Sequence, residues 1–518
     1  MTFNARCTRL VLFVSTSLFF SLSLAGCHKT EIVAPDTLVI GIESGPRLLD
    51  PRLYTDAASS RIGDLLFNGL VQRDDDFSIQ PDLAESWETP SPARYVFHLR
   101  PDIYFHDGQK LTSKDILASI NFVLDPANKS PWRSSYLMID SITTPDDTTI
   151  IFDLKKPSAP FLGFLTMGIT PAETDKDMAI SPIGTGPFKF VDYKTEERVT
   201  LVRNESYFDG RAKLEGVIFK IIPDETVRVL SLEKGAVHLI MNPITPNILP
   251  RFKDNPNLKV ISKLGTNYSY LGFNLKDPLT GKLEVRKAVA HAIDRRGIIK
   301  YILKGLAEPA TGPLSPASKF YEGGARKYDY DPAKARKILD DAGFKDPDGD
   351  GPKVRFTLKY STSQNELRKR IAEVFQFQLG KVGIGLDIRS YEWGTFYSHI
   401  KKGNFQIFSL TWVGIVDPDI LYYIFNSSSA PPDGANRGGY KNERVDELTE
   451  LGRVTFGEER KVVYSKIQRI IADDLPYVSL WHSVNVVVMD KRVEGFVVAP
   501  DENLKSLKDV VLTPDVKQ

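Results

Sequence analysis

A loop rich in glycine and proline, residues 431–440, carries two side chains that could hold a small solute through its polar groups. The amide of Asn436 both donates and accepts hydrogen bonds, and the planar guanidinium of Arg437 is suited to a carboxylate. The glycines of this loop allow the backbone to approach a ligand closely. A plain surface loop with a solvated Arg437 is the alternative, and the sequence leaves both open.

A second candidate contact is Tyr360, at the end of a segment in which apolar and polar residues alternate, 353–360. Such alternation predicts a strand, and the residues that follow, 361–364, are of types that begin helices. In open α/β sheets, ligands bind at the carboxyl ends of the strands. We therefore expect Tyr360 to lie at a binding edge, with simple helix capping by residues 361–364 as the alternative.

An acidic turn, residues 346–351, contains the first half of a calcium-binding pattern. Asp346, Asp348 and Asp350 stand at positions 1, 3 and 5 of such a loop, with a glycine at position 6. Position 12 is Thr357 instead of the bidentate glutamate, and a strand is predicted where a helix should follow. The turn is compatible with a weak structural Ca²⁺ site and with a solvated turn, and the sequence indicates no other cofactor.

Motifs of catalysis are absent from the sequence. Its 7 histidines never occur as H-E-x-x-H or as a pair four residues apart, and there is no G-x-S-x-G. The pair Gly184 and Gly186 is followed by Pro187, which lacks the N–H that a phosphate cradle needs, so we interpret it as a turn into a strand. We expect a binding protein with no catalytic residues, and a hydrolase is disfavoured.

The elements that position these side chains are predicted by the spacing of apolar residues. A short apolar run, residues 38–42, is typical of a strand buried on both faces. Apolar residues in 284–294 recur at helical spacing. From 331 to 388 the predicted order is helix, strand, helix, strand, which favours a lobe with parallel strands. The predicted fold class is therefore α/β.

The length of 518 residues predicts more than one lobe, because single cores stop growing at about 250–300 residues. The composition, 42% hydrophobic and 26% charged, is ordinary for a globular protein. A formal net charge of +1 gives no electrostatic reason to expect nucleic acid as a partner. We therefore expect a globular protein of at least two lobes.

The amino terminus predicts export. Arg6 and Arg9 precede an apolar stretch that ends in Leu24-Ala25-Gly26-Cys27, which is similar to the lipobox of bacterial lipoproteins. Residues 1–26 would be the signal peptide, Cys27 the lipidated residue and residues 27–35 a tether. Cleavage would remove both arginines, which changes the net charge from +1 to −1, and would leave no pair of thiols for a disulfide. A plain cleavable signal is the alternative.

Several short motifs follow one another along the chain: Leu83-Ala84-Glu85-Ser86-Trp87, Phe105-His106-Asp107-Gly108, Gly184-Thr185-Gly186-Pro187-Phe188, Phe273-Asn274, Val285-Arg286-Lys287-Ala288 and Tyr330-Asp331-Pro332-Ala333-Lys334. In this order they resemble family 5 of the extracytoplasmic solute-binding proteins of ABC importers, which serves oligopeptides, dipeptides and nickel. The match runs from about residue 38 to about residue 498.

The resemblance implies a type II periplasmic-binding-protein fold of cluster C, in which two α/β lobes close like a clam around two hinge segments. It implies a first lobe made of residues 36–60, 182–272 and 490–518. An extra small α+β domain, residues 61–181, would sit on that lobe, and residues 273–489 would form the second lobe.

The resemblance also implies a role for Trp412. In peptide-binding members a tryptophan at this position covers the ligand backbone, and an aspartate three residues later takes the peptide's ammonium. Here that later position is Ile415, a departure from the family pattern. Asp417 could substitute from two residues further on. The alternatives are a core position for Trp412 and a turn at Asp417.

Function follows from the resemblance as an expectation. It implies a lipid-anchored, monomeric substrate-binding protein of the cell envelope, which captures an oligopeptide-like solute by hinge closure and delivers it to an ABC permease and its ATPase subunits. Two alternatives stay open. The same fold could bind a metal chelate, a sugar or an opine, or the chain could be an envelope lipoprotein with a sensor or chaperone role.

Overall fold

The computed structural model describes residues 36–241, 244–349, 351–431 and 434–514. Within these ranges the largest sheet has 11 strands, in the order β15-β14-β16-β12-β17-β11-β1-β10-β9-β8, with β13 paired to β17. Its strands are β1 (Thr37–Ile42), β8 (Phe188–Lys194), β9 (Arg198–Arg203), β10 (Gly216–Ile221), β11 (Leu239–Met241), β12 (Leu258–Phe273), β13 (Ala307–Pro309), β14 (Phe356–Ser363), β15 (Ile384–Tyr391), β16 (Ile407–Trp412) and β17 (Tyr477–Asp490).

The remaining strands form small sheets: β2 (Val71–Arg73) with β3 (Ile79–Pro81), β18 (Val493–Glu494) with β19 (Val511–Leu512), and the four strands β4 (Ala84–Ser91), β5 (Arg94–Leu99), β7 (Thr149–Leu154) and β6 (Ile139–Asp146). The helices are α1 (Ala57–Leu66), α2 (Ser113–Leu124), α3 (Arg133–Tyr136), α4 (Phe161–Phe164), α5 (Glu225–Glu233), α6 (Leu249–Lys253), α7 (Leu283–Ala292), α8 (Arg295–Tyr301), α9 (Pro332–Asp341), α10 (Glu366–Gly380), α11 (Trp393–Lys401), α12 (Ile420–Phe425), α13 (Glu443–Val454) and α14 (Gly457–Asp474). Short 3₁₀ turns are η1 (Pro126–Asn128), η2 (Pro246–Ile248) and η3 (Lys505–Asp509).

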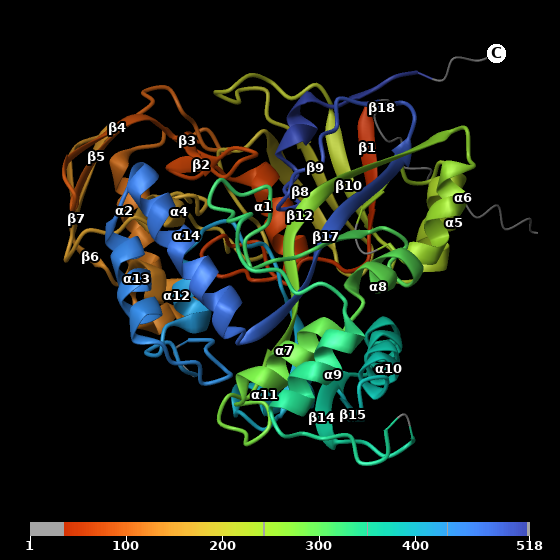
Figure 1. Cartoon of the computed structure of the whole chain (residues 1–518). Helices are drawn as coiled ribbons and strands as arrows, with labels where there is room; N and C mark the ends of the chain where they lie inside the picture. The colour runs from red at the N-terminus through yellow and green to blue at the C-terminus, as the bar shows by residue number, and fades with distance from the viewer. Residues whose placement is uncertain (1–35, 242–243, 350, 432–433, 515–518) are drawn as a thin grey trace, which may run out of the picture. The chain divides into compact units, whose positions relative to one another are not determined.

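Two long antiparallel strands, β12 and β17, run through both halves of the large sheet (Figure 1). One end of β17 pairs with β11, and the opposite end of β12 pairs with β16. The register between them is interrupted from Leu264 to Tyr268. Residues before this break pack into cores with β1 and β11, and residues after it pack into cores with β14 and β16. The break therefore lies where the sheet passes from one lobe to the other.

The first lobe is assembled from three separate stretches of the chain, as the core that contains Leu38, Phe219 and Val487 shows. Strand β1 has the predicted position and is buried on both faces. Helix α1 belongs to this core, because its apolar residues Ile62 and Leu65 face it. A domain boundary at residue 61 would therefore divide α1, and the small domain's own core begins at Leu70.

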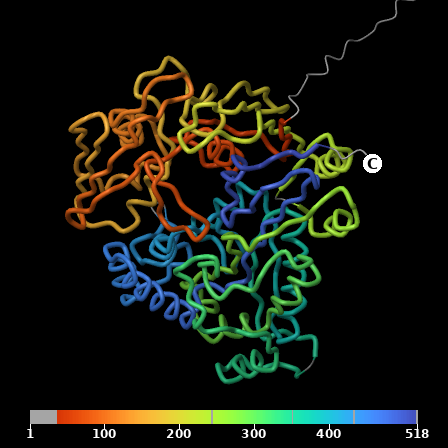
Figure 2. The backbone as a smooth tube through the Cα atoms, turned by 90° about the horizontal axis from the view of Figure 1, so that it is seen from above, coloured from red at the N-terminus to blue at the C-terminus, as the bar shows by residue number. Residues whose placement is uncertain are grey.

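The small domain packs α2 against the sheet of β4 to β7, which lies to one side of the tube view (Figure 2). Alternation in β5 places Tyr95 and Phe97 in this core, where Phe97 meets the edge of Phe152 at 5.8 Å. Helix α2 begins after Thr112, where the carboxylate of Asp115 accepts the Thr112 N–H at 2.7 Å.

The second lobe has the predicted parallel character: β14 is parallel to both β15 and β16. Helices α9 and α10 agree with the spacing in the sequence. The expected end of β14 at Tyr360 is wrong, because Ser361 to Ser363 continue the strand opposite residues 389–391 of β15 and are buried. The cap of α10 is Asn365, whose side chain accepts the N–H of Arg368 at 3.1 Å.

The predicted signal peptide, Cys27 and the tether lie outside the described residues. Among the helices that the structure describes, none has the length and the apolar character that crossing a bilayer requires.

Candidate functional site

Trp412, the last residue of β16, lies in a cluster of aromatic rings. Its indole is stacked on Tyr270 of β12, with centroids 6.4 Å apart and planes inclined by 10°, and it meets the edge of Tyr423 at 6.1 Å. Tyr270 is stacked in turn on Tyr477 of β17 at 4.1 Å. The buried indole Nε1 has no hydrogen-bond partner among the described residues. Ring contacts therefore hold Trp412 in place.

Arg437 lies over this cluster. Its guanidinium carbon is 4.8 Å from the centre of the Trp412 ring and 5.4 Å from that of Tyr397 on α11. Its Nη1 donates to the hydroxyl of Tyr270 at 3.3 Å, and its Nη2 donates to the hydroxyl of Tyr397 at 3.2 Å. These contacts orient the guanidinium and leave three of its five N–H groups without a partner among the described residues.

Charge around Arg437 is one-sided. Burial acts to lower the pKa of Arg437, but the oxygens of Tyr270, Tyr477 and Tyr397 act in the opposite direction, and the pKa lies above its ordinary value. No carboxylate lies within ion-pair distance of Arg437 in the part of the chain that the structure describes. The guanidinium therefore stays charged, and no described carboxylate neutralises it.

A second arginine, Arg368 of α10, extends the cluster. Its guanidinium carbon is 5.2 Å from the ring of Trp393, which is stacked on Tyr397 with centroids 5.7 Å apart. Arg368 donates to the hydroxyl of Ser363 at 3.4 Å, and burial lowers its pKa. Arginine and aromatic side chains thus alternate across the carboxyl ends of β14 and β16. Arg368 also lines a cavity of about 290 Å³ together with Ser409 and Thr411.

The substitute predicted for the missing ammonium partner, Asp417, is engaged elsewhere. Its two carboxylate oxygens accept from Arg460 of α14 at 2.9 and 3.3 Å. Ile415 is buried in the apolar core beneath the cluster. Arg73 of the small domain lines the same cavity of about 240 Å³ as Asp417 and Arg460, and nearby Asp417 acts to raise the pKa of Arg73 against a larger effect of burial.

Two further predicted contacts serve the protein's interior. The Asn436 amide donates to the carbonyls of Asn426 and Tyr440 at 3.1 and 2.7 Å, and its oxygen accepts the Tyr440 N–H. Asn436 therefore shapes the loop that presents Arg437. Tyr360 is fully buried, and its hydroxyl lies 2.6 Å from that of Ser409. Tyr360 therefore contacts β16, and its role as a solute contact stays a prediction.

The acidic turn has local contacts of its own. Asp346 lies 3.4 Å from a guanidinium nitrogen of Arg355, and Asp348 accepts the N–H of Lys353 at 3.1 Å. Asp350 lies outside the described residues. Among the described residues there is no group of three potential metal ligands. The calcium site stays a prediction, and the contacts of Asp346 and Asp348 favour the acidic turn.

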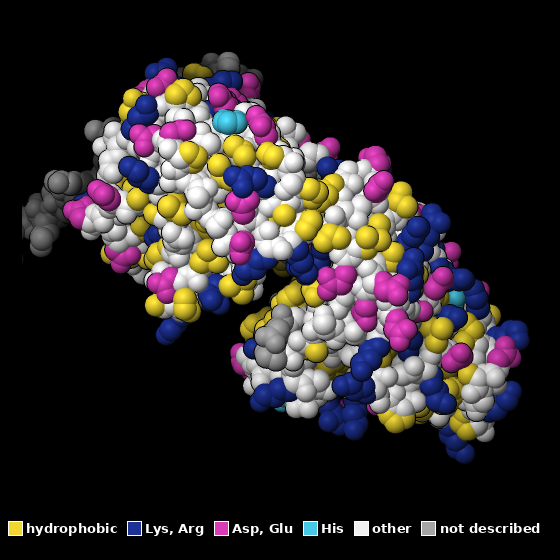
Figure 3. All heavy atoms as spheres, turned by 90° about the vertical axis from the view of Figure 1, so that its left-hand side faces the viewer, with side chains coloured by type: hydrophobic (Ala, Val, Ile, Leu, Met, Phe, Trp, Pro, Cys, Tyr) yellow, Lys and Arg dark blue, Asp and Glu magenta, His cyan; other side chains and the backbone are white. Residues whose placement is uncertain are grey.

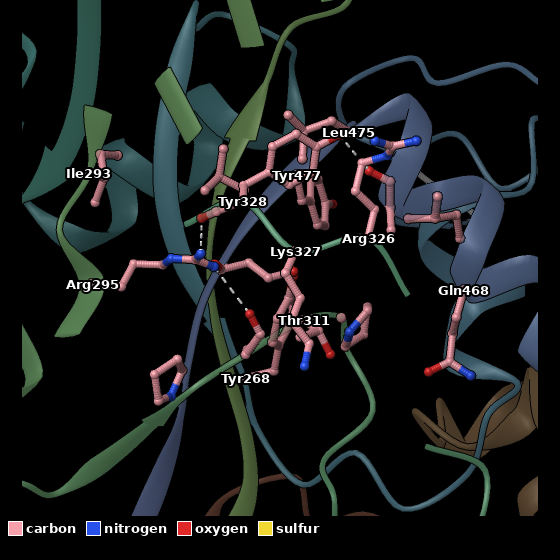
Figure 4. Close-up of a pocket in the computed structure, with 18 of the residues that line it drawn as sticks. Tyr268, Ile293, Arg295, Thr311, Arg326, Lys327, Tyr328, Gln468, Leu475 and Tyr477 are labelled. Atoms are coloured by element: carbon pink, nitrogen blue, oxygen red, sulfur yellow. Dashed lines mark hydrogen bonds between the residues drawn. The ribbon is translucent and has the colours of Figure 1, made fainter. Parts of the chain in front are cut away.

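A cavity of about 200 Å³ lies behind the aromatic cluster, with Tyr268 and Tyr477 in its wall (Figure 4). Arg295 points into the region between these rings and Tyr328, and it donates to the backbone carbonyls of Ala310, Tyr328 and Ser479. Because these carbonyls accept hydrogen bonds from its guanidinium, we interpret Arg295 as a structural residue. On the outer surface, a notch is visible with lysine and arginine side chains along its edges (Figure 3).

The sequence names Trp412 and Arg437 as candidate contacts, which stay predictions, and it does not name the residues that the structure places against them. Trp393 and Tyr397 stand four residues apart on α11, which places them on one helical face, and this signal is visible in the sequence. Tyr270 looks like an ordinary core residue of a strand. Its role depends on the pairing of β12 with β16, which no local pattern reveals. The cluster can stack, donate hydrogen bonds and attract negative charge, which is the chemistry of binding.

Comparison with known proteins gives the class that this fold and this site define. The family model of the bacterial extracellular solute-binding proteins, family 5, matches residues 78–433. The chain therefore belongs to family 5 of the bacterial extracellular solute-binding proteins. This is a family of solute-binding proteins and not of enzymes, and its members act outside the cytoplasm.

Relatives in this family bind chemically different solutes. The oligopeptide-binding protein AppA of Bacillus subtilis is 31% identical, over 91% of this chain and 90% of its own, and its structure with a nonapeptide has a TM-score of 0.76. NikZ of Campylobacter jejuni, solved with Ni(L-His), is 27% identical with a TM-score of 0.78, over 92% of this chain and 100% of its own. AgaA of A. tumefaciens R10, solved with agropinic acid, is 27% identical with a TM-score of 0.73, over 91% and 97%.

Proposed function

We propose that this protein captures an oligopeptide-like solute outside the cytoplasm and delivers it to the permease and ATPase subunits of an ABC importer, with no catalytic step. The observation that carries the proposal is the cluster of Trp412, Tyr270 and Arg437 at the carboxyl ends of the second lobe's strands, in a chain that belongs to a solute-binding family. This edge is where open α/β sheets bind ligands. The protein acts as a monomer.

Capture proceeds by hinge closure about the register break of β12 and β17. Asn267 lies in this break, and its side chain accepts the N–H of Gly414 at 2.9 Å. Gly414 has a φ of +67°, which favours glycine, and it follows Trp412 by two residues. A solute on Trp412 thus acts next to the hinge. A solute held at micromolar Kd supplies about 8 kcal/mol, and only its preference for the closed state drives closure.

A second candidate is a non-peptide ligand, such as a metal chelate, a sugar or an opine. It is favoured by Ile415 and by the engagement of Asp417 with Arg460, since neither residue offers a free carboxylate to the ammonium of a peptide.

Thermal melting in the presence of defined probes separates these candidates. Tripeptide pools, nickel with L-histidine, a set of opines and a set of sugars are each added to the purified protein. A ligand of the native state raises the melting temperature through RT ln(1 + [L]/Kd). We expect the peptide pools to raise it. A rise with the chelate, opines or sugars alone selects the second candidate, and no rise with any probe contradicts solute capture and favours a sensor or chaperone role.

The anchor is a separate part of the proposal. Cys27, preceded by Leu24-Ala25-Gly26, would carry the lipid that holds the protein at the membrane. Cys27→Ser should release the protein into the soluble fraction of the envelope with an unchanged melting temperature, because Cys27 lies at the start of a tether. A variant that still sediments with membranes in high salt contradicts the lipid anchor.

A further inference from the structure

Two largely buried arginines of this chain, Arg286 and Arg295, donate their hydrogen bonds to backbone carbonyls. Arg286 is an example: its guanidinium donates to the carbonyls of Thr280, Gly281, Asp474 and Leu475 at 2.7 to 3.0 Å. Arg437 receives nothing comparable. Its partners are two tyrosine hydroxyls at 3.2 and 3.3 Å and the faces of two rings. Its position is therefore fixed, while most of its hydrogen-bonding capacity is unused.

The first two acidic side chains after Trp412 in the sequence are both engaged with other arginines. Asp417 pairs with Arg460, and Asp419 lies 3.1 Å from a nitrogen of Arg453. Ile415 contributes no charge. Among the described residues, the charge nearest to Trp412 is therefore the positive charge of Arg437, where the family pattern places a carboxylate for the ammonium of a peptide.

Resting on the proposed function, we infer that the solute of this protein places a carboxylate on Arg437, against the ring of Trp412, and brings no ammonium group to this position. The rings of Trp412 and Tyr397 lie against the guanidinium, and the two hydroxyls occupy one N–H on each terminal nitrogen. The unused N–H groups suit a carboxylate, which accepts two parallel hydrogen bonds from one arginine. An ammonium here would be repelled by Arg437, and no described carboxylate within ion-pair distance of Arg437 would offset this repulsion.

This inference predicts which ends of a peptide matter. A tripeptide pool is prepared in four forms: free, N-acetylated, C-amidated and both acetylated and amidated. We expect the N-acetylated acid to bind the wild-type protein at least as tightly as the free peptide in calorimetric titration. Amidation of that acid should weaken binding about 30-fold or more, the effect of removing one member of a buried charge pair. Tighter binding of the free peptide, with loss on acetylation, overturns the inference.

Matched variants locate the effect. Arg437→Gln should abolish the preference for acid over amide, whereas Arg368→Gln removes a charge from the same cluster and should retain the preference. If both variants lose this preference equally, the carboxylate responds to the general positive potential of the cluster, and the inference of a specific contact with Arg437 is wrong. Circular dichroism and melting curves establish that both variants fold.

A smaller probe tests whether Arg437 binds a carboxylate in the absence of any peptide. Benzoate carries a carboxylate where benzamide carries a neutral amide, and each is added at the same concentrations in a melting experiment. Benzoate should raise the melting temperature of the wild type and of Arg368→Gln more than benzamide does, and the difference should vanish in Arg437→Gln. Equal effects in the wild type overturn this inference. If benzoate gives the expected result but no peptide pool binds, the proposal of a peptide-like solute is wrong, while the inference that Arg437 binds a carboxylate is supported.

Discussion

Trp412 is held by ring contacts, so its replacement measures what its surface contributes to solute binding. Trp412→Ala should weaken binding of the natural solute by about 2–3 kcal/mol, or roughly 30- to 150-fold, because about 25 cal/mol is lost for each Å² of apolar surface that the solute no longer covers. Trp132→Ala, which removes an exposed indole from the small domain, is the control and should leave the affinity unchanged. Unchanged affinity in a folded Trp412→Ala contradicts this role.

The ion pair of Asp417 with Arg460 predicts that this carboxylate stabilises the fold, whereas the sequence suggests a contact to the solute, and replacement of Asp417 distinguishes the two. Its partner Arg460 has only 8% of its side chain exposed, so Asp417→Asn leaves a largely buried charge unpaired. The free energy of unfolding should fall by about 3 kcal/mol in urea titrations, while the solute affinity stays within about twofold. Asp387→Asn, which breaks an exposed ion pair with Arg389, is the control and should lower the free energy of unfolding by about 1 kcal/mol or less.

The opposite pattern for Asp417→Asn would be decisive against this account. A large loss of affinity at unchanged stability means that the carboxylate faces the solute.

At the scale of residues, the family resemblance indicated Trp412, and the residue type of Arg437 indicated a partner for a carboxylate. Both roles stay predictions. The sequence could not predict the fate of Asp417, because Arg460 lies 43 residues away along the chain and approaches only after α14 packs on the lobe.

At the scale of elements, β17 carries a buried histidine close to the register break. His482 is 1% exposed and packs against Tyr268 at 5.5 Å. Burial lowers its pKa to about 4, against about 6.5 in the unfolded chain. Between these values the unfolded chain binds a proton that the native protein does not. The stability that His482 contributes is therefore complete above pH 6.5 and declines as the pH falls towards 4.

Urea titrations at pH 7 and pH 5 measure this contribution. From pH 7 to pH 5, the free energy of unfolding of the wild type should fall by about 1–2 kcal/mol more than that of His482→Gln. Other titrating groups, such as buried Asp64 with a pKa raised to about 7 by burial, act in both proteins and cancel in the difference. Equal losses in the wild type and His482→Gln show that His482 is not kept neutral.

Elements were predictable wherever their apolar spacing is regular. Helices α7, α9 and α10 and strand β1 occur where the sequence indicates them, because each buries one stripe or both faces in a core. The end of β14 was not predictable in this way. Ser361 to Ser363 are polar residues of the kind that begin helices, and only their pairing with β15 shows that they are buried strand.

At the scale of the whole molecule, the sequence motifs predicted the fold family, and the central sheet supports the proposed hinge. Strands β12 and β17 belong to both lobes, so a register break in this single pair can serve as the hinge. The three separate stretches that build the first lobe come together through β1, β10, β11 and β17. Such long-range pairing leaves no local signal, and only the family resemblance indicated it.

Native mass spectrometry of the protein purified from the cell envelope tests most directly whether this protein holds a small solute at the Trp412 cluster. We predict a population heavier than the polypeptide by the mass of one small solute, which leaves on collisional activation and is missing from Trp412→Ala. A bare polypeptide mass, unchanged after incubation with the peptide pools, the chelate, the opines and the sugars, would contradict the account.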